Sequence, residues 1–351
     1  MNRTKILLLH KGYSSFVRAD ELLLKKHYEV STYYLNPSKK VISFFYNHLR
    51  FVIYMLLHFR KFKLVYSWFG DYHSFHASVL SKLLRLKHII VVGGNDAVSI
   101  PAIQYGVFYK NNLRSKLIKI AYKLADAILC VDVSLVKGRN MYVEGKNKVG
   151  LENFIPGISK KCIVIPTGYD ANYWNCASQK KSNQVLTVGI VDSENRATLK
   201  GFDLIVQLAN RLPDVHFIFI GVEKYPGILK APKKNLTIID KVNQKTLKKY
   251  YCQSKVYVQF SITEGLPNTL CEAMLCECIA AGSNVNGIPT VIRDKEMILE
   301  TKDAVQAEKI ILKALCASQN KGKENRKFIK EYYSEERRGR ALLKTIDDIV
   351  T

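Results

Sequence analysis

The sequence predicts an α/β protein of two domains, each built on a doubly wound parallel β-sheet. The chain has 351 residues, against roughly 100–200 for a typical domain, so two domains are expected. Short apolar runs alternate with longer helical patterns, which is typical of a parallel sheet covered by helices on both faces. Hydrophobic residues make up 48% of the chain and charged residues 24%, a composition that excludes a disordered or fibrous protein.

In the first half, short apolar runs predict the strands. These runs are Lys5–Leu9, Glu29–Leu35, Leu64–Phe69, His88–Val92, Ala127–Val131 and Lys161–Ile165. The segments between them carry helical patterns, at Arg18–Lys26, Val41–Arg60, His73–Leu84 and Leu113–Ala125. This order predicts parallel strands joined by helical crossovers.

A polar stretch, Cys176–Asn183, interrupts the alternation, so we place the domain boundary close to it. Beyond it, strands are predicted at Val185–Val191, His216–Gly221, Leu236–Asp240, Lys255–Ser261 and Cys278–Gly282. Helices are predicted at Gly201–Arg211, Gln244–Tyr251, Leu266–Leu275, Ala304–Leu315 and Arg326–Ile349. Two such halves imply a cleft between them, and parallel sheets bind ligands at the carboxyl ends of their strands.

The chain is strongly basic, with 54 Lys and Arg against 30 Asp and Glu, a formal net charge of +24. This excess favours an anionic partner, such as nucleic acid, an acidic membrane face or a phosphorylated substrate. The eight cysteines form no CxxC pair, and several lie in apolar runs, as buried free thiols do. We therefore expect a reducing, cytoplasmic compartment and no metal site.

One stretch, Val41–Phe59, has a membrane-like composition. Asn47, His48 and Arg50 interrupt it, and its longest apolar run, Phe51–Leu57, is far shorter than the ~20 residues of a spanning helix. Two interpretations stay open. The helix either faces the core with a solvated basic rim, or lies on an anionic membrane surface as an interfacial amphipathic helix.

The sharpest local feature runs from Glu264 to Glu272, after a predicted strand and into a helix. Pro267 suits the first turn of a helix, and Gly265 lets a ligand approach the backbone. The N–H groups of that turn would bind phosphate. The spacing would put both carboxylates on one side of the helix, about 10 Å apart along its axis, as acceptors for sugar hydroxyls. The alternative is a capping glutamate and a solvated glutamate.

A second candidate site is the loop after the strand Val185–Val191, which carries Arg196, Lys200 and Gly201. A guanidinium fork and an ammonium group before a helix suit a diphosphate.

These motifs occur in a fixed order: Gly189-Ile190-Val191, Arg196, Lys200-Gly201-Phe202-Asp203, Phe217 to Gly221, Glu264-Gly265-Leu266-Pro267 and Glu272-Ala273-Met274. The order resembles the C-terminal half of the family 4 retaining glycosyltransferases, which have the GT-B architecture: two Rossmann-like domains facing a cleft. The resemblance implies an acceptor domain at residues 1–170 and a nucleotide-sugar donor domain at residues 171–333. It also implies that the last helix, residues 334–351, returns to the first domain.

The resemblance implies roles for matching residues of the donor half. Arg196 and Lys200 would bind the donor diphosphate and stabilise the leaving group. Glu264 would contact the donor sugar, and Glu272 the nucleotide ribose. The remaining predicted contacts are the backbone of the segment Gly265, Leu266, Pro267 and Asn268, and the loop at Val242.

In the first half, Lys11 and Gly12 match the loop that approaches donor and acceptor. Many members of the family have a histidine near the transferring carbon, where this sequence has Gly93-Gly94-Asn95-Asp96. Asn95 or Asp96 would then orient the donor sugar or the acceptor hydroxyl. A plain turn is the alternative.

The implied activity is retaining, metal-independent transfer of a hexosyl-type sugar. The donor would be UDP- or GDP-linked, and the acceptor a hydroxyl of a lipid-linked molecule or a growing glycan. We expect no other cofactor and no nucleic-acid partner, and a cytoplasmic location with a candidate peripheral attachment to the membrane. The alternatives are a sugar-nucleotide epimerase on the same scaffold and a basic nucleic-acid-binding protein.

Overall fold

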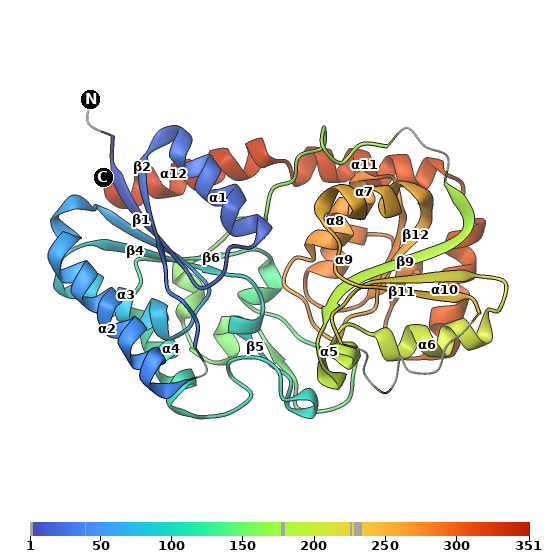
Figure 1. Cartoon of the computed structure of the whole chain (residues 1–351), viewed down its shortest axis with the longest axis horizontal. Coiled ribbons are helices and arrows are strands. Elements are labelled where there is room, and N and C mark those ends of the chain that lie inside the picture. Colours follow the sequence, from blue (N-terminus) through green and yellow to red (C-terminus); the bar gives the residue numbers. More distant parts are fainter. Residues whose placement is uncertain (1–2, 39, 177–179, 225–226, 228–233) are drawn as a thin grey trace. The chain divides into compact units, whose positions relative to one another are not determined.

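The computed structural model describes residues 3–38, 40–176, 180–224, 227 and 234–351. Contacts divide the chain into two compact units (Figure 1). Unit 1 comprises Met1–Gly138, Lys148–Gly168 and Glu336–Thr351, and unit 2 comprises Arg139–Asn147 and Tyr169–Glu335. Each unit is a doubly wound α/β structure around a six-stranded parallel sheet, so the predicted fold class is confirmed.

The sheet of unit 1 has the strand order β2-β1-β3-β4-β6-β8. The strands are β1 (Lys5–His10), β2 (Glu29–Tyr34), β3 (Leu64–Trp68), β4 (Lys87–Val92), β6 (Ala127–Cys130) and β8 (Cys162–Val164). The chain runs from β1 outward to β2 and then returns to the other side of β1 for β3. The carboxyl ends of β1 and β3 therefore flank a topological switch point, where such sheets bind ligands.

Five helices accompany this sheet. They are α1 (Ser15–His27), α2 (Val41–His58), α3 (Tyr72–Leu83), α4 (Leu113–Leu124) and α12 (Glu335–Val350). In Figure 1, α12 lies beside α1, and an added Cβ on its Gly339 would lie 3.0 Å from Leu23. The Arg338 guanidinium of α12 donates to both oxygens of the buried Asp20 carboxylate of α1 at 2.6 and 2.7 Å. This ion pair attaches the end of the chain to unit 1.

The sheet of unit 2 has the order β11-β10-β9-β12-β13-β14. Its strands are β9 (Lys181–Val191), β10 (His216–Val222), β11 (Leu236–Ile239), β12 (Ser254–Gln259), β13 (Ile279–Ser283) and β14 (Ile298–Leu299). Its helices are α5 (Glu194–Leu199), α6 (Phe202–Arg211), α7 (Gln244–Gln253), α8 (Asn268–Leu275), α9 (Gly287–Ile292), α10 (Ala304–Cys316) and α11 (Asn320–Tyr332). The switch point of this sheet lies between β9 and β12.

Three predicted elements differ from the structure. The expected loop of Arg196 contains the helix α5, whose six residues are too few to show a periodic pattern. The helix expected from Leu266 begins at Asn268, because Pro267 is the N-cap in an extended conformation. The closing helical region is two helices, α11 and α12, separated at Tyr333.

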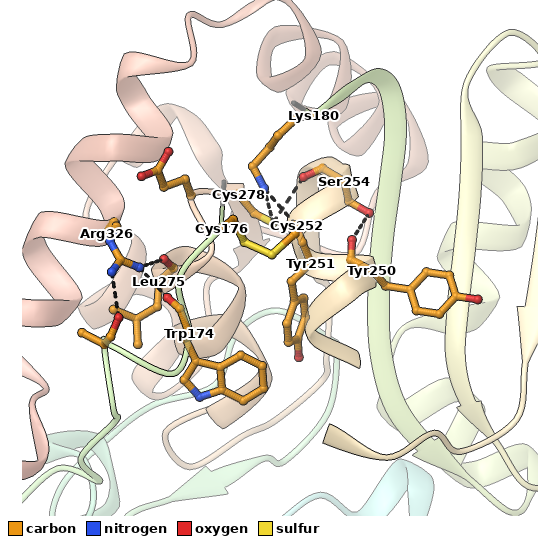
Figure 2. Close-up of a disulfide and its surroundings, with 12 residues drawn as sticks. Trp174, Cys176, Lys180, Tyr250, Tyr251, Cys252, Ser254, Leu275, Cys278 and Arg326 are labelled. Carbon is orange, nitrogen blue, oxygen red and sulfur yellow. Dashed lines mark hydrogen bonds between the residues drawn. A yellow bond between two sulfur atoms is a disulfide. The ribbon is translucent and has the colours of Figure 1, made fainter. Parts of the chain in front are cut away.

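The prediction of free thiols is wrong for Cys176 and Cys252, which form a disulfide across 76 residues of sequence (Figure 2). The sulfur of Cys276 lies within 4.8 Å of both. The pairing joins the segment after Trp174 to the last turn of α7. It has no sequence signature, because the two cysteines belong to no common motif.

Within the described ranges, no helix is long and apolar enough to cross a bilayer. The membrane-like stretch forms α2, whose Phe51 and Met55 are fully buried in the core of unit 1.

Candidate functional site

At the switch point of unit 2, Lys200 and Glu264 form an ion pair. The Lys200 ammonium donates to Glu264 Oε1 at 2.6 Å, and the two side chains are 19% and 15% exposed. Lys200 lies after β9 and α5, and Glu264 lies in the loop after β12. The sheet therefore brings together two residues that the sequence places 64 positions apart. A cation beside a carboxylate acceptor at this position suits a ligand with both anionic groups and hydroxyls.

Two glycines fix the surroundings of Lys200. Gly201 has φ +73°, and a Cβ there would lie 2.1 Å from the Phe260 carbonyl oxygen. Gly189, near the end of β9, lies so close that its added Cβ would be 3.2 Å from the Lys200 side chain. Any larger residue at 201 would strain the backbone and displace the turn between α5 and α6. These glycines therefore set the position of the ammonium group.

A buried polar network holds the Glu264 carboxylate. Its Oε1 also accepts hydrogen bonds from Ser261 Oγ at 2.8 Å and from Gln259 Nε2 at 3.2 Å. The Gln259 amide oxygen in turn accepts from Tyr257 Oη at 2.7 Å and from Thr269 Oγ1 at 3.2 Å. Because each member has a partner, the network restricts the carboxylate to one orientation.

The sequence prediction missed this network. Gln259 is the last residue of β12, and Ser261 lies two positions beyond it, after the apolar run Val256–Val258. Two polar side chains on the same face at the carboxyl end of a buried strand were the signal that would have found them.

Helix α8 begins directly beyond the Glu264 loop, with Pro267 as its N-cap. Its first N–H groups have no partner within the helix and carry the positive end of the helix dipole. Leu266 and Pro267 are buried, and the Gly265 carbonyl oxygen accepts from Gly287 N at 3.1 Å. Asn268 Oδ1 accepts from Tyr169 Oη at 2.7 Å. The predicted segment Gly265–Asn268 is thus held rigidly at the helix start.

The predicted relation between Glu264 and Glu272 is wrong, because only Glu272 belongs to the helix. Glu272 is buried, 8% exposed, so it is not a solvated glutamate either. Desolvation raises the pKa of its carboxyl to about 8, and the hydrogen bond from Tyr251 Oη at 3.2 Å opposes this shift. At neutral pH the protonated form of Glu272 is therefore abundant.

The disulfide lies next to this carboxyl group. Cys252 follows Tyr251, the residue whose hydroxyl contacts Glu272. Figure 2 shows Tyr251 and Trp174 on the same side of the disulfide, with their rings 5.6 Å apart. The bond thus constrains the helix end that carries the Glu272 partner.

Two further predicted residues of unit 2 lie outside the side-chain network of Lys200 and Glu264. Arg196, on α5, is exposed, and its Nε is 4.0 Å from Asp192 Oδ1. It precedes Lys200 by four positions, so both project from the same side of this turn. Val242 is half-buried in the loop after β11, the edge strand, which β10 separates from β9.

Unit 1 has an ion-pair cluster at its own switch point. Lys11 follows β1, Asp71 is the N-cap of α3 after β3, and the Lys11 ammonium contacts the Asp71 carboxylate. Arg114 donates to the same carboxylate through Nε and Nη2, at 2.8 Å each. These two cations hold the pKa of Asp71 well below its usual range, against the effect of burial. Gly12 is exposed, with nothing within 4 Å of an added Cβ.

Asp71 and Arg114 were not predicted, since no local motif contains them. The turn Gly93–Asp96 was predicted, and the structure places Asp96 in the interior, 2% exposed. Its carboxylate accepts from the Gly70, Gly93 and Gly94 N–H groups at 2.8–3.1 Å. Asp96 therefore holds this turn together from inside, and its buried carboxylate does not face a ligand as the predicted catalytic role requires. Asn95 is exposed beside it.

Comparisons with known proteins show what the chain is similar to. Residues 175–334 match the family model described as glycosyl transferases group 1. Alpha-galactosylglucosyldiacylglycerol synthase of Streptococcus pneumoniae is 29% identical over 215 residues, 50% of this chain and 52% of the relative. A subunit of the phosphatidylinositol N-acetylglucosaminyltransferase of Arabidopsis thaliana is 22% identical over 44% of this chain and 36% of its own length. The chain thus matches about half or less of the length of these curated relatives.

The whole fold resembles solved structures of low sequence identity. Sucrose-phosphate synthase from Thermosynechococcus elongatus aligns with a TM-score of 0.72 and 14% identity, over 99% of both chains. Anabaena HepE, solved in complex with UDP and glucose, aligns with a TM-score of 0.70 and 11% identity, over 98% of this chain and 99% of that one. The chain therefore has the GT-B fold, and its residues 175–334 match the model of the glycosyl transferases group 1.

Proposed function

We propose that this chain is a glycosyltransferase that moves a sugar from a nucleotide-diphosphate donor to a hydroxyl acceptor. The observation that carries the proposal is the Lys200–Glu264 pair at the switch point of unit 2, held by Ser261 and Gln259. In this proposal, the Lys200 ammonium and the α8 N-terminus bind the diphosphate, and Glu264 accepts hydrogen bonds from the donor sugar. The matching relatives, whose names describe glycolipid synthesis, support a glycan or lipid acceptor.

Negative charge develops on the diphosphate as it departs from the sugar. Stabilising this charge is the main way in which the site would lower the activation free energy. Once the donor is bound, Lys200 and the N–H groups of α8 would already face the diphosphate, so they would stabilise that charge as it develops. Arg196, exposed on the same turn as Lys200, would complete the contact by a bidentate hydrogen bond. These groups would perform the work that a divalent cation performs elsewhere, so we propose a metal-independent reaction.

The Lys200 ammonium that would bind the diphosphate is also the partner of Glu264. The ammonium group shares its charge between the carboxylate and an incoming phosphate. We propose that donor binding turns the Lys200 ammonium toward the diphosphate, while Ser261 and Gln259 keep Glu264 in place for the sugar. The anomeric configuration would be retained, as the family resemblance implies.

The other predicted residues receive supporting roles. We propose that Glu272 donates or accepts a hydrogen bond at the nucleotide ribose, since its buried carboxyl group exchanges a proton near neutral pH. The segment Gly265–Asn268 would present its backbone to phosphate and sugar, and the loop at Val242 would border the nucleotide. In unit 1, Lys11, Gly12 and Asn95 remain candidates for contacts with the acceptor.

A thermal-shift screen of UDP-, GDP- and ADP-sugars tests the proposal, because a bound donor raises the unfolding temperature by mass action. We expect one nucleotide class to stabilise the wild type, and Lys200→Met to lose this shift. Lys302→Met is the matched control, since Lys302 forms an ion pair with Asp203 at the same exposed fractions, 19% and 15%.

Product analysis then separates the reaction classes. A new glycoside with the donor's anomeric configuration, formed at the same rate with a chelator, supports the proposal. Conversion of the donor alone into an isomeric sugar nucleotide would identify an epimerase and overturn it. No stabilisation by any sugar nucleotide, together with salt-sensitive binding to random DNA, would also overturn it.

A further inference from the structure

The outward face of α2 is apolar along its whole length. Its exposed side chains include Ile42, which is 85% exposed, and Leu57, which is 73% exposed. We call this surface the α2 stripe; it comprises Val41, Ile42, Phe45, Tyr46, Leu49, Ile53, Leu56 and Leu57. All but Val41 project within an arc of roughly 120° at about 100° per residue. So many large exposed apolar residues on one helix mark an interaction site.

The opposite face of α2 holds the helix in unit 1. Phe51 and Met55 are fully buried and pack with Leu7, Leu9 and Val65 of the sheet. The helix is therefore seated, and the stripe is not a core face that is turned outward. The core-facing interpretation of this sequence is therefore confirmed for the inner face, and the outer face is open to a partner.

The segment of the sequence that contains the stripe carries charges of a single sign. Residues 30–70 contain no Asp or Glu, and they contain six cations: Lys39, Lys40, Arg50, Arg60, Lys61 and Lys63. The Arg50 guanidinium lies over the Tyr46 ring at 5.8 Å, and Arg60 lies over Phe59 at 5.7 Å. Arg50 borders the stripe at its edge, so it can stay at the level of lipid headgroups while the stripe enters the acyl region.

We propose that the α2 stripe docks on an anionic lipid surface. An apolar strip bordered by cations is complementary to a membrane with acidic headgroups. A second copy of the chain is a poor occupant, because two such faces would bring the cations of both copies together without any acidic residue in this region. The helix would lie in the interface rather than span it, consistent with its length and its buried inner face.

The inner side of α2, opposite the stripe, contacts α3 beside the switch point of unit 1. The Phe44 ring of α2 contacts Tyr72, the first residue of α3, at 5.2 Å between centroids. One turn further, His48 Nδ1 lies 3.2 Å from His76 Nδ1. Asp71, which holds Lys11, caps the same end of α3. Docking of the stripe would therefore place on the lipid surface a helix whose other side packs next to the switch point. In combination with the proposed function, on which this step rests, the acceptor is a molecule that resides in the membrane.

Vesicle flotation of the whole protein tests the docking, without donor or acceptor. The vesicles contain either phosphatidylcholine alone or phosphatidylcholine with phosphatidylglycerol. The variant Ile42→Gln/Leu49→Gln/Leu57→Gln removes apolar side chains from the stripe. The matched control is Leu83→Gln/Leu113→Gln, because these leucines are 73% and 66% exposed on other helices of the same unit.

We expect the wild type and the control to bind the phosphatidylglycerol vesicles equally, and the stripe variant to bind at least about tenfold more weakly. The variant Arg50→Gln/Arg60→Gln should weaken binding and reduce its sensitivity to salt. Unfolding midpoints of all variants should match that of the wild type, since the replaced side chains are exposed.

Three results would overturn the docking proposal. In the first, the stripe variant binds vesicles as well as the wild type does. In the second, the wild type binds both vesicle types equally. In the third, the wild type self-associates without binding vesicles, and the stripe variant does not self-associate. Because flotation needs no sugar nucleotide, each of these leaves the donor proposal intact. Loss of donor binding in Lys200→Met, measured without vesicles, reports on the donor site alone.

Discussion

The buried carboxyl group of Glu272 predicts that unit 2 loses stability as pH rises. Burial raises its pKa from 4.5 to about 8. Between these values the folded chain holds a proton that the unfolded chain has released, so the free energy of unfolding falls with rising pH. The shift corresponds to about 5 kcal/mol, at about 1.4 kcal/mol per pKa unit. The variant Glu272→Gln keeps the size and the hydrogen bonding of the neutral group but cannot ionise.

The assay is denaturant unfolding at about pH 5 and at about pH 8, and we expect the wild type to lose about 2–5 kcal/mol more than Glu272→Gln. Trp174 reports on unit 2, because it is buried there with its ring 5.6 Å from that of Tyr251. The only other tryptophan is Trp68 of unit 1, which Trp68→Phe removes from the signal. Glu331→Gln, at an exposed position of α11, is the control. Parallel pH profiles of wild type and Glu272→Gln would refute the reasoning.

Three further predictions concern structure. Asp20→Asn leaves a buried guanidinium without its carboxylate, so we expect unit 1 to lose about 3–5 kcal/mol in denaturant unfolding; a loss below about 1 kcal/mol would contradict the buried pair. Gly201→Ala, at φ +73° and facing a carbonyl oxygen, should destabilise unit 2 by at least about 1 kcal/mol. In contrast, Gly12→Ala should leave the free energy of unfolding unchanged. Equal destabilisation by the two variants would contradict backbone strain at position 201. Peptide mapping without reductant should recover Cys176 and Cys252 as one linked pair, and free thiols at both would contradict it.

Much of the fold was predictable because the strands are continuous apolar runs. In unit 2, for example, the centre of β10 is the run Phe217–Gly221, in which every residue except the glycine has a large apolar side chain. Such apolar runs, separated by amphipathic segments, are compatible with few folds other than a parallel sheet covered by helices. Short elements were not predicted. Helix α5, for example, has only six residues, too few for a helical pattern of apolar residues to repeat.

A residue of the candidate site was predictable where it belongs to a local motif of its own. Lys200 and Glu264 were both identified, and the structure places them 2.6 Å apart. The Glu264–Glu272 spacing misled because it assumed a helix that includes both residues. Pro267 fits the first turn and the N-cap almost equally well, and a shift of the helix start removes Glu264 from the helix.

Partners that are distant in sequence could not be found. Arg114 contacts Asp71 across 43 residues of sequence, and the disulfide joins two cysteines that are 76 residues apart. Asp96 was misjudged for a related reason, because the turn that contains it is visible in sequence but its burial against Gly70 is not. Pairings of this kind depend on strand order, which sequence periodicity does not report.

The most direct test of the proposed donor site is calorimetric titration of the nucleoside diphosphate selected by the screen. Lys200→Met should weaken its binding by about 10- to 100-fold, since a hydrogen bond to a charged group contributes about 1.5–3 kcal/mol. Lys302→Met should bind like the wild type. Unchanged affinity in Lys200→Met, or an equal loss in both variants, would contradict a diphosphate site at the end of β9.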